Sequence, residues 1–271
     1  MRFKDRVVLV TGGAKGMGEP VAEALAREGA HLVLAARDLG RLQQQVEAIR
    51  RELPGVKALA VKADVAEESQ VMEMVEQAVK EFGRLDILVN TAGGVGPVDT
   101  PLHEIKADEW DTVFAVKVRG TFLCCKHTVP HMMKQRYGKI VNFSGTAGIA
   151  GYVNRASYSA AQWALRGLTR TLALEVGPYN INVNAVCPGL IEGGRIQGVR
   201  EEKARRWGWT PEQVREKDVA ETVMGRLGEE ADIVEAVLFL ASDAAKNMTG
   251  QDFIVDAGWS VSPCKREGPK R

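Results

Sequence analysis

The residues that could do chemistry begin directly after a short apolar run near the start of the chain. The glycine-rich segment 11–18, TGGAKGMG, follows the apolar, β-branched residues 6–10 and precedes apolar residues at helical spacing. Glycine lacks a Cβ, so such a turn bends tightly and lets its backbone approach a pyrophosphate. A helix that starts here points unpaired N–H groups and its positive dipole end at the same anion. Strand, glycine turn and helix in this order predict a dinucleotide site.

The elements that would position this loop alternate between strand and helix. This alternation predicts an α/β fold, a doubly wound parallel sheet of the Rossmann type, with the ligand crevice at the carboxyl ends of the strands. We expect Pro130 to break or bend a long helical region. Strands are predicted at residues 6–10, 31–35, 58–61, 87–90, 139–143, 182–186 and 253–255, and helices at 38–53, 67–82, 108–136, 157–177 and 233–240.

Composition narrows the class of protein. The 271 residues, 45% of them apolar, can fill the core of one large domain. Lys and Arg number 36 against 35 acidic residues, a balance without the positive field that nucleic acid or an anionic membrane attracts. No apolar run approaches the length of a membrane span, and the first residues do not resemble a signal peptide. The four cysteines show neither metal-ligand spacing nor a disulfide framework. We expect a cytoplasmic protein with no metal.

The loop spacing T-G-x-x-x-G-x-G resembles the coenzyme loop of the short-chain dehydrogenase/reductase family. The resemblance extends from Lys4 to about Gly258 and is also carried by ADV at 63–65, NTAG at 90–93, Tyr158, PG at 188–189 and residues 250–256. It implies one Rossmann domain over residues 1–262, followed by a flexible tail at 263–271. Residues 232–241 and 253–259 are similar to the surfaces through which family members form tetramers, so we expect a homotetramer, with a dimer as the alternative.

The resemblance also implies which residues hold the cofactor. Ala36 stands where members that prefer NAD carry an acid, and it leaves room for a 2′-phosphate that Arg37 and Lys15 could bind. We therefore expect NADP(H) rather than NAD(H), although Asp38 could pair with Arg37 or repel the phosphate. The predicted cofactor-binding residues are Gly12, Ala14, Lys15, Gly16, Met17, Gly18, Arg37, Asp64, Val65, Asn90, Ala92, Gly93, Tyr158, Gln162, Pro188, Gly189 and Ile191.

Of the four catalytic positions that the resemblance implies, this chain keeps one. Tyr158 matches the family's tyrosine acid/base. Gln162 stands where the family has a lysine that lowers the pKa of that tyrosine, and Gly145 where it has a serine that binds the carbonyl. Lys117 stands where it has an asparagine that orders a water. The resemblance thus implies an atypical catalytic tetrad.

Two groups could compensate for these departures. If Lys117 points inward, it could supply the missing cation, so that Lys117 and Gln162 form a relocated pair; the alternative is a lysine on the helix surface. Ser144 or Thr146 could offer a hydroxyl beside Gly145, although strand alternation aims each of them differently. The candidate catalytic residues are Tyr158, Lys117, Gln162 and Ser144.

The polar segment 191–225 follows the Pro188–Gly189 turn, where the family places its substrate lid. The resemblance therefore predicts a helical lid over about these residues. Trp207 and Trp209 have two interpretations of equal weight. They contact substrate from a mobile lid, or they cover apolar surface in an amphipathic insert.

Three functions follow from these residues. We favour an NADP(H)-dependent oxidoreductase that acts on a small alcohol or ketone through Tyr158 in a rearranged site. The second is non-redox chemistry, such as that of a lyase, hydratase or isomerase, with the nucleotide bound but not consumed. The third is a catalytically inactive nucleotide-binding protein. The coenzyme loop argues against loss of cofactor binding, and the altered tetrad argues against routine dehydrogenase activity.

Overall fold

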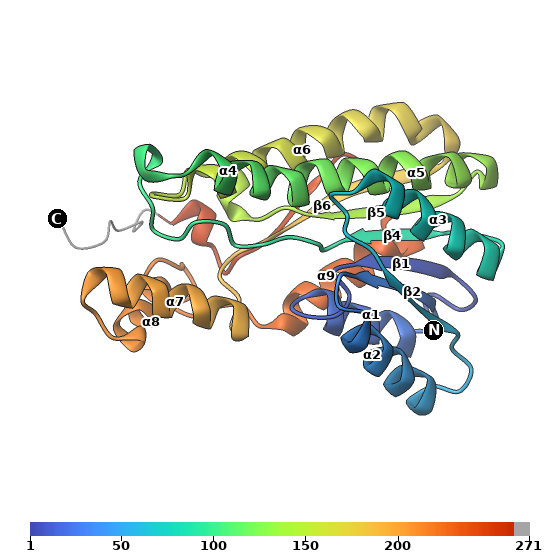
Figure 1. Ribbon diagram of the computed structural model, residues 1–271, viewed down its shortest axis with the longest axis horizontal. Coiled ribbons are helices and arrows are strands. Elements are labelled where there is room, and N and C mark those ends of the chain that lie inside the picture. Colours follow the sequence, from blue (N-terminus) through green and yellow to red (C-terminus); the bar gives the residue numbers. More distant parts are fainter. Residues whose placement is uncertain (263–271) are drawn as a thin grey trace.

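The computed structural model describes residues 1–262 and contains one seven-stranded parallel sheet (Figure 1). The strands are β1 (Val7–Thr11), β2 (His31–Ala36), β3 (Ala58–Lys62), β4 (Ile87–Asn90), β5 (Gly138–Phe143), β6 (Ile181–Pro188) and β7 (Asp252–Val255). Their order in the sheet is β3-β2-β1-β4-β5-β6-β7. The strand order reverses direction between β1 and β4, which is where a doubly wound sheet opens a ligand crevice. The predicted α/β Rossmann fold is confirmed.

Helices cover both faces of the sheet. In Figure 1, α1, α2 and α9 lie on one face, and α3, α5 and α6 lie on the other. Because both faces are covered, the strands are continuous apolar runs: Val8 and Val10 of β1 join the first layer, while Val7 and Leu9 join the second. The helices are α1 (Gly18–Arg27), α2 (Leu39–Glu52), α3 (Glu68–Phe82), α4 (Ala107–Phe114), α5 (Gly120–Gln135), α6 (Ala156–Val176), α7 (Gly194–Trp207), α8 (Pro211–Ala220) and α9 (Glu230–Ala241).

The long helical region predicted at 108–136 is interrupted, but not at Pro130. The chain passes from α4 to α5 through a π-helical segment, Ala115–Arg119, while α5 continues across Pro130. A π-helical turn inserts an extra residue into a helix and is found most often at functional sites. The expected break at Pro130 is therefore wrong, and the actual irregularity lies at the segment that carries Lys117.

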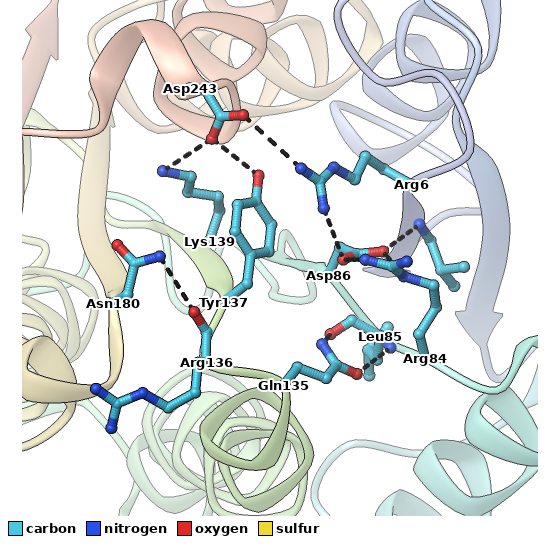
Figure 2. Close-up of polar contacts among 11 residues, drawn as sticks. Arg6, Arg84, Leu85, Asp86, Gln135, Arg136, Tyr137, Lys139, Asn180 and Asp243 are labelled. Atoms are coloured by element: carbon cyan, nitrogen blue, oxygen red, sulfur yellow. Dashed lines mark hydrogen bonds and ion pairs between the residues drawn. The ribbon is translucent and has the colours of Figure 1, made fainter.

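A charged cluster joins the amino ends of β1 and β4 (Figure 2). Asp86 is fully buried and accepts a hydrogen bond from Val7 N at 2.9 Å. Arg84 donates to the same carboxylate from Nε at 2.8 Å, and Arg6 Nη1 lies 3.3 Å from Asp86 Oδ1. Breaking a buried charge pair is costly, so this carboxylate is expected to fix the strand ends and both arginines.

The same cluster extends to β5 (Figure 2). Tyr137 Oη donates to Asp243 Oδ1 at 3.0 Å, and the Lys139 ammonium lies 3.5 Å from that oxygen. Arg6 reaches Asp243 as well, at 3.8 Å. Each cation of this cluster therefore has a carboxylate partner.

Within residues 1–262, every helix is too short or too polar to cross a membrane. The same range holds no group of three or more His, Cys, Asp or Glu side chains arranged to bind a metal ion. Cys124, Cys125 and Cys187 are buried free thiols. Cys264 and the tail predicted at 263–271 lie outside the described residues.

Candidate functional site

The glycine loop between β1 and α1 forms a cradle that side chains would close. Gly12 and Gly16 have φ of 71° and 60°, a region that glycine adopts without strain. A Cβ on Gly18 would lie 2.3 Å from Gly12 O, so the start of α1 can approach the turn only as glycine. No side chain caps α1, whose cap residue is Met17. Because Glu19 N donates to Gly16 O at 3.3 Å and Pro20 has no N–H, Gly18 N is the donor at the start of α1 that could face an anion.

The segment after β4 is tied to the glycine loop by Thr91. The Thr91 hydroxyl donates to Thr11 O, and Ala92 N donates back to Thr11 Oγ1 at 3.3 Å. Asn90 points into the sheet interior, where its Nδ2 donates to Asn142 Oδ1 at 2.9 Å. The structure therefore brings residues 90–93 against the glycine loop and gives Asn90 a supporting contact.

Arg37 lies just after the carboxyl end of β2, beside Asp64, which is also among the predicted cofactor-binding residues. Its Nη1 is 3.9 Å from Asp64 Oδ2, and its side chain is exposed. Asp38 caps α2 by accepting from Arg41 N at 3.1 Å and lies 3.6 Å from Arg41 Nε. The neighbouring acid is therefore engaged with α2, and Arg37 pairs with Asp64 instead of Asp38. Lys15 is exposed on the glycine loop.

Lys117 points into the fold. The π-helical segment places it against the strand ends, where it is 4% exposed. Its Nζ lies 5.2 Å from the centroid of the Tyr158 ring, and a Cβ on Gly93 would lie 3.0 Å from that Nζ. Burial lowers the pKa of Lys117 to about 8, with smaller effects from Tyr158, Arg195 and Arg155. The inward orientation expected from the sequence is the one observed, while a role in turnover stays a prediction.

Two further cations surround Tyr158, and the sequence reasoning missed both. The Arg155 guanidinium lies over the Tyr158 ring, 4.7 Å from its centroid, and Arg195 Nη2 lies 3.4 Å from Tyr158 Oη. Burial acts to raise the pKa of Tyr158, but Arg195, Lys117, Arg155 and a side-chain hydrogen bond with Gln162 lower it to about 8. The sequence could have pointed to Arg155, because it lies three residues before Tyr158. Arg195 lies 37 residues after Tyr158, and only the fold brings these two residues together.

Gly145 and Gln162 form a matched pair. A Cβ at Gly145 would lie 2.8 Å from Gln162 Nε2. A residue larger than glycine at position 145 would therefore crowd the Gln162 amide. That amide donates to Ser144 O at 2.9 Å, and the Ser144 hydroxyl donates to Gln162 O at 3.1 Å. Ser144 is buried and directed at α6 by this contact. The structure thus aims the Ser144 hydroxyl at α6, as strand alternation allowed, and its catalytic role stays a prediction.

Three of the predicted cofactor-binding residues, Pro188, Gly189 and Ile191, lie at or just after the carboxyl end of β6. Gly189 N donates to Val255 O at 2.9 Å, and a Cβ on Gly189 would lie 2.6 Å from Asp256 Cβ. Ile191 then pairs with Gly228 in an isolated parallel bridge. These close contacts hold Pro188, Gly189 and Ile191 in one turn above the strand ends.

The segment predicted as a lid forms two helices, α7 and α8, which lie together beside the strand ends (Figure 1). Trp207 Nε1 donates to Asp99 Oδ2 at 2.7 Å, in the loop that follows β4. Trp209 contacts Trp207 edge to face, with ring centroids 5.1 Å apart. These contacts fasten α7 to the loop after β4, and both interpretations of the two tryptophans stay predictions.

Comparisons with known proteins agree with this geometry. A protein-family model described as enoyl-(acyl carrier protein) reductase matches residues 12–260. The 3-oxoacyl-(acyl-carrier-protein) reductase FabG of Thermotoga maritima is 35% identical over 261 residues, which cover 95% of this chain and 99% of that protein. The cis-4-hydroxycyclohexanecarboxylate dehydrogenase of Sinomonas cyclohexanicum is 36% identical over 261 residues, covering 96% and 98%.

Solved structures give the same result. Levodione reductase matches with a TM-score of 0.91 and 34% identity over 96% of this chain and 99% of that one. NAD+-bound xylitol dehydrogenase matches with a TM-score of 0.90 and 32% identity, covering 95% and 100%. A variant of actinorhodin polyketide ketoreductase with NADPH reaches 0.88 and 31%, covering 94% and 97%. The glycine loop, the sheet topology and the similarity to these relatives over nearly the whole chain agree. This chain belongs to the short-chain dehydrogenase/reductase family.

Proposed function

We propose that this protein is an NADP(H)-dependent oxidoreductase that interconverts a small alcohol and a ketone through Tyr158 in a rearranged site. One observation carries the proposal: Tyr158 is surrounded by three cations that lower its pKa to about 8. A general acid/base works best when its pKa lies near the operating pH. The matched relatives include reductases and dehydrogenases by name.

The reaction needs one hydride and one proton. When bound, the nicotinamide supplies or accepts the hydride at the carbonyl carbon. In reduction, Tyr158 Oη donates the proton to the carbonyl oxygen and becomes a tyrosinate. In oxidation, the tyrosinate takes the hydroxyl proton. The charges of Arg195, Lys117 and Arg155 stabilise the tyrosinate in both directions. Lys117 thus takes over the electrostatic task of the lysine that the family carries where Gln162 stands.

The residues present fit an NADP-type cofactor. A Cβ on Gly18 would fill the pyrophosphate cradle, and Arg37 and Lys15 are exposed on the side predicted for the adenosine. Asp64 lies 3.9 Å from Arg37 and is proposed to bind the adenine amino group. Solved relatives include one with NAD+ and one with NADPH, so the preference rests on these side chains.

Assembly and lid belong to the same proposal. We propose that the substrate lies under α7 and α8, within one domain over residues 1–262.

We also propose a homotetramer whose subunits contact one another at residues 232–241 and 253–259. β7 is an edge strand, and Ile254 on it is 42% exposed. Open sheet edges are usually covered in native proteins. Light scattering that finds a monomer at micromolar concentration would exclude the tetramer.

The test combines a binding titration with a turnover screen. NADPH is expected to bind more tightly than NADH, and the Arg37→Ala variant to lose about 1.5–3 kcal/mol of NADPH affinity with little change for NADH. A panel of ketones is then screened for NADPH consumption by absorbance. Equal affinity for both cofactors in the unmodified protein contradicts the NADP preference. Tight binding without turnover of any ketone or alcohol favours non-redox chemistry or an inactive nucleotide-binding protein.

A further inference from the structure

Arg195 differs from every other arginine of the lid. The helices α7 and α8 carry five arginines, and four of them pair with lid carboxylates: Arg200 and Arg215 with Glu192, and Arg205 and Arg206 with Glu202. Over the described part of the chain, no carboxylate oxygen lies within 4.0 Å of the Arg195 guanidinium. Arg195 instead turns toward Tyr158.

The contacts that Arg195 does make are weak. One nitrogen, Nη2, lies 3.4 Å from both Tyr158 Oη and Gly94 O. Both distances are at the long end for a hydrogen bond, and a guanidinium has five N–H donors in a planar fork. Most of its capacity to bind a carboxylate in bidentate geometry is therefore unused.

Arg155 provides a second, independent observation. Its side chain is 7% exposed, and its Nη2 donates to Val95 O at 2.7 Å. Its Nη1 is buried and has no hydrogen-bond partner among the described residues. The Asp99 carboxylate accepts hydrogen bonds from Asn154 and Trp207, and it acts on Arg155 electrostatically from a distance. Arg155 therefore adds positive charge beside Tyr158 that no carboxylate in direct contact balances.

We propose that Arg195 binds a carboxylate of the substrate, and that the charge of Arg155 strengthens this anion site. This inference rests on the proposed function and deepens it. Because the Arg195 guanidinium lies one contact from Tyr158 Oη, the carboxylate must lie a few bonds from the reacting carbonyl. The substrate class is therefore a hydroxy or oxo acid whose carboxylate lies a few bonds from the carbonyl carbon.

A binding experiment tests this without any turnover. Cyclohexanecarboxylate and its neutral carboxamide are titrated into the protein saturated with NADP(H), by calorimetry. The carboxylate is expected to bind about 10- to 100-fold more tightly than the amide, because charge-assisted hydrogen bonds are the stronger ones. Arg195→Met should remove this preference and leave NADPH affinity unchanged. Arg195→Lys should keep part of it, since lysine offers charge without the planar fork.

Arg205→Met is the matched control, because Arg205 lies on the same helix, is 70% exposed and pairs with Glu202. It should keep the full preference. Turnover of 4-oxocyclohexanecarboxylate and of its methyl ester completes the test, with the acid favoured by a similar factor. Equal binding of carboxylate and amide to the unmodified protein overturns the inference, even if ketones are reduced. Loss of NADPH affinity in Arg195→Met with the carboxylate preference intact also overturns it. A carboxylate preference without reduction of any ketone contradicts the proposed function instead.

Discussion

Two tyrosines at opposite ends of the sheet have nearly the same neighbours and opposite electrostatics. Tyr137 lies in the cluster at the amino ends of the strands (Figure 2), and Tyr158 lies at the carboxyl ends. Each ring has one arginine and one lysine against it. Around Tyr137 these are Arg6 at 4.0 Å and Lys139 at 5.5 Å, and around Tyr158 they are Arg155 at 4.7 Å and Lys117 at 5.2 Å from the ring centroid.

The difference lies in the carboxylates. Tyr137 Oη donates to Asp243, and burial together with that acid raises the pKa of Tyr137. Tyr158 Oη faces Arg195, and the cations around it have no carboxylate within 4.0 Å in the described residues. Positive charge that is balanced holds a fold together, whereas positive charge left unbalanced beside an acid prepares that acid to ionise.

The sharpest way to separate the two tyrosines is to remove each hydroxyl. Tyr158→Phe is expected to lower turnover about 10²- to 10⁴-fold, the usual range for a lost general acid/base. Tyr137→Phe makes the same chemical change at the balanced cluster. It should leave kcat within about twofold and cost roughly 1 kcal/mol of unfolding free energy. If both variants lose turnover equally, the hydroxyl of Tyr158 has no special role.

Removing the buried carboxylate of the cluster at the amino ends of the strands tests whether that cluster serves stability alone. Asp86→Asn leaves Arg6 and Arg84 without their buried carboxylate, so the free energy of unfolding should fall by about 3 kcal/mol. Denaturant titration measures this loss. Turnover per folded molecule should not change, because the cluster lies at the end of the sheet remote from Tyr158. A loss of turnover at full folding would show that the two ends are coupled.

A smaller effect is expected from the cation beside Tyr158. Lys117→Met removes one of the charges that lower the pKa of Tyr158, so that pKa should rise. Oxidation needs the tyrosinate, so its rate increases as the pH rises through about 8 in the unmodified protein. Reduction needs the neutral tyrosine, and its rate falls over the same range. In Lys117→Met the pH dependence of both the oxidation rate and the reduction rate should shift to higher pH. Oxidation at pH 8 should then slow, by about fivefold if the pKa of Tyr158 rises by one.

Lys117 titrates near the same pH as Tyr158, so each profile reports macroscopic values of a coupled pair. The double variant Lys117→Asn with Gln162→Lys returns the cation to the family's position and should recover part of the lost rate. If the pH dependence of both rates in Lys117→Met equals that of the unmodified protein, Lys117 is a packing residue.

The sequence predicted the fold well because its signals are local. Apolar runs between glycine turns define β1 and its neighbours, and their alternation with helices dictates a parallel sheet. The inward position of Lys117 was also predictable, since a matched family position carries the direction of its side chain. The π-helical segment was not predictable, because Pro130 offered a more obvious breaking point than any residue at 115–119.

Contacts between distant segments were harder to predict. Arg195 reaches Tyr158 only because α7 folds back over the strand ends. Gly145 and Gln162 are two separate departures in the sequence, but a shared space makes them one arrangement in the fold. Asp38 looked like a partner or competitor for Arg37, but its carboxylate caps α2 and Arg37 pairs with Asp64.

The most direct test of this account is the pKa of Tyr158 itself. The chain has four tyrosines, and labelling the ζ carbon of each lets NMR follow their ionisation separately, with Tyr158→Phe giving the assignment. Tyr158 should ionise at about pH 8, before Tyr137, whose pKa burial raises. In Lys117→Met the Tyr158 value should move upward. Ionisation of Tyr158 at or above pH 10, or no later in Lys117→Met than in the unmodified protein, would contradict the claim that unbalanced cations prepare this tyrosine for catalysis.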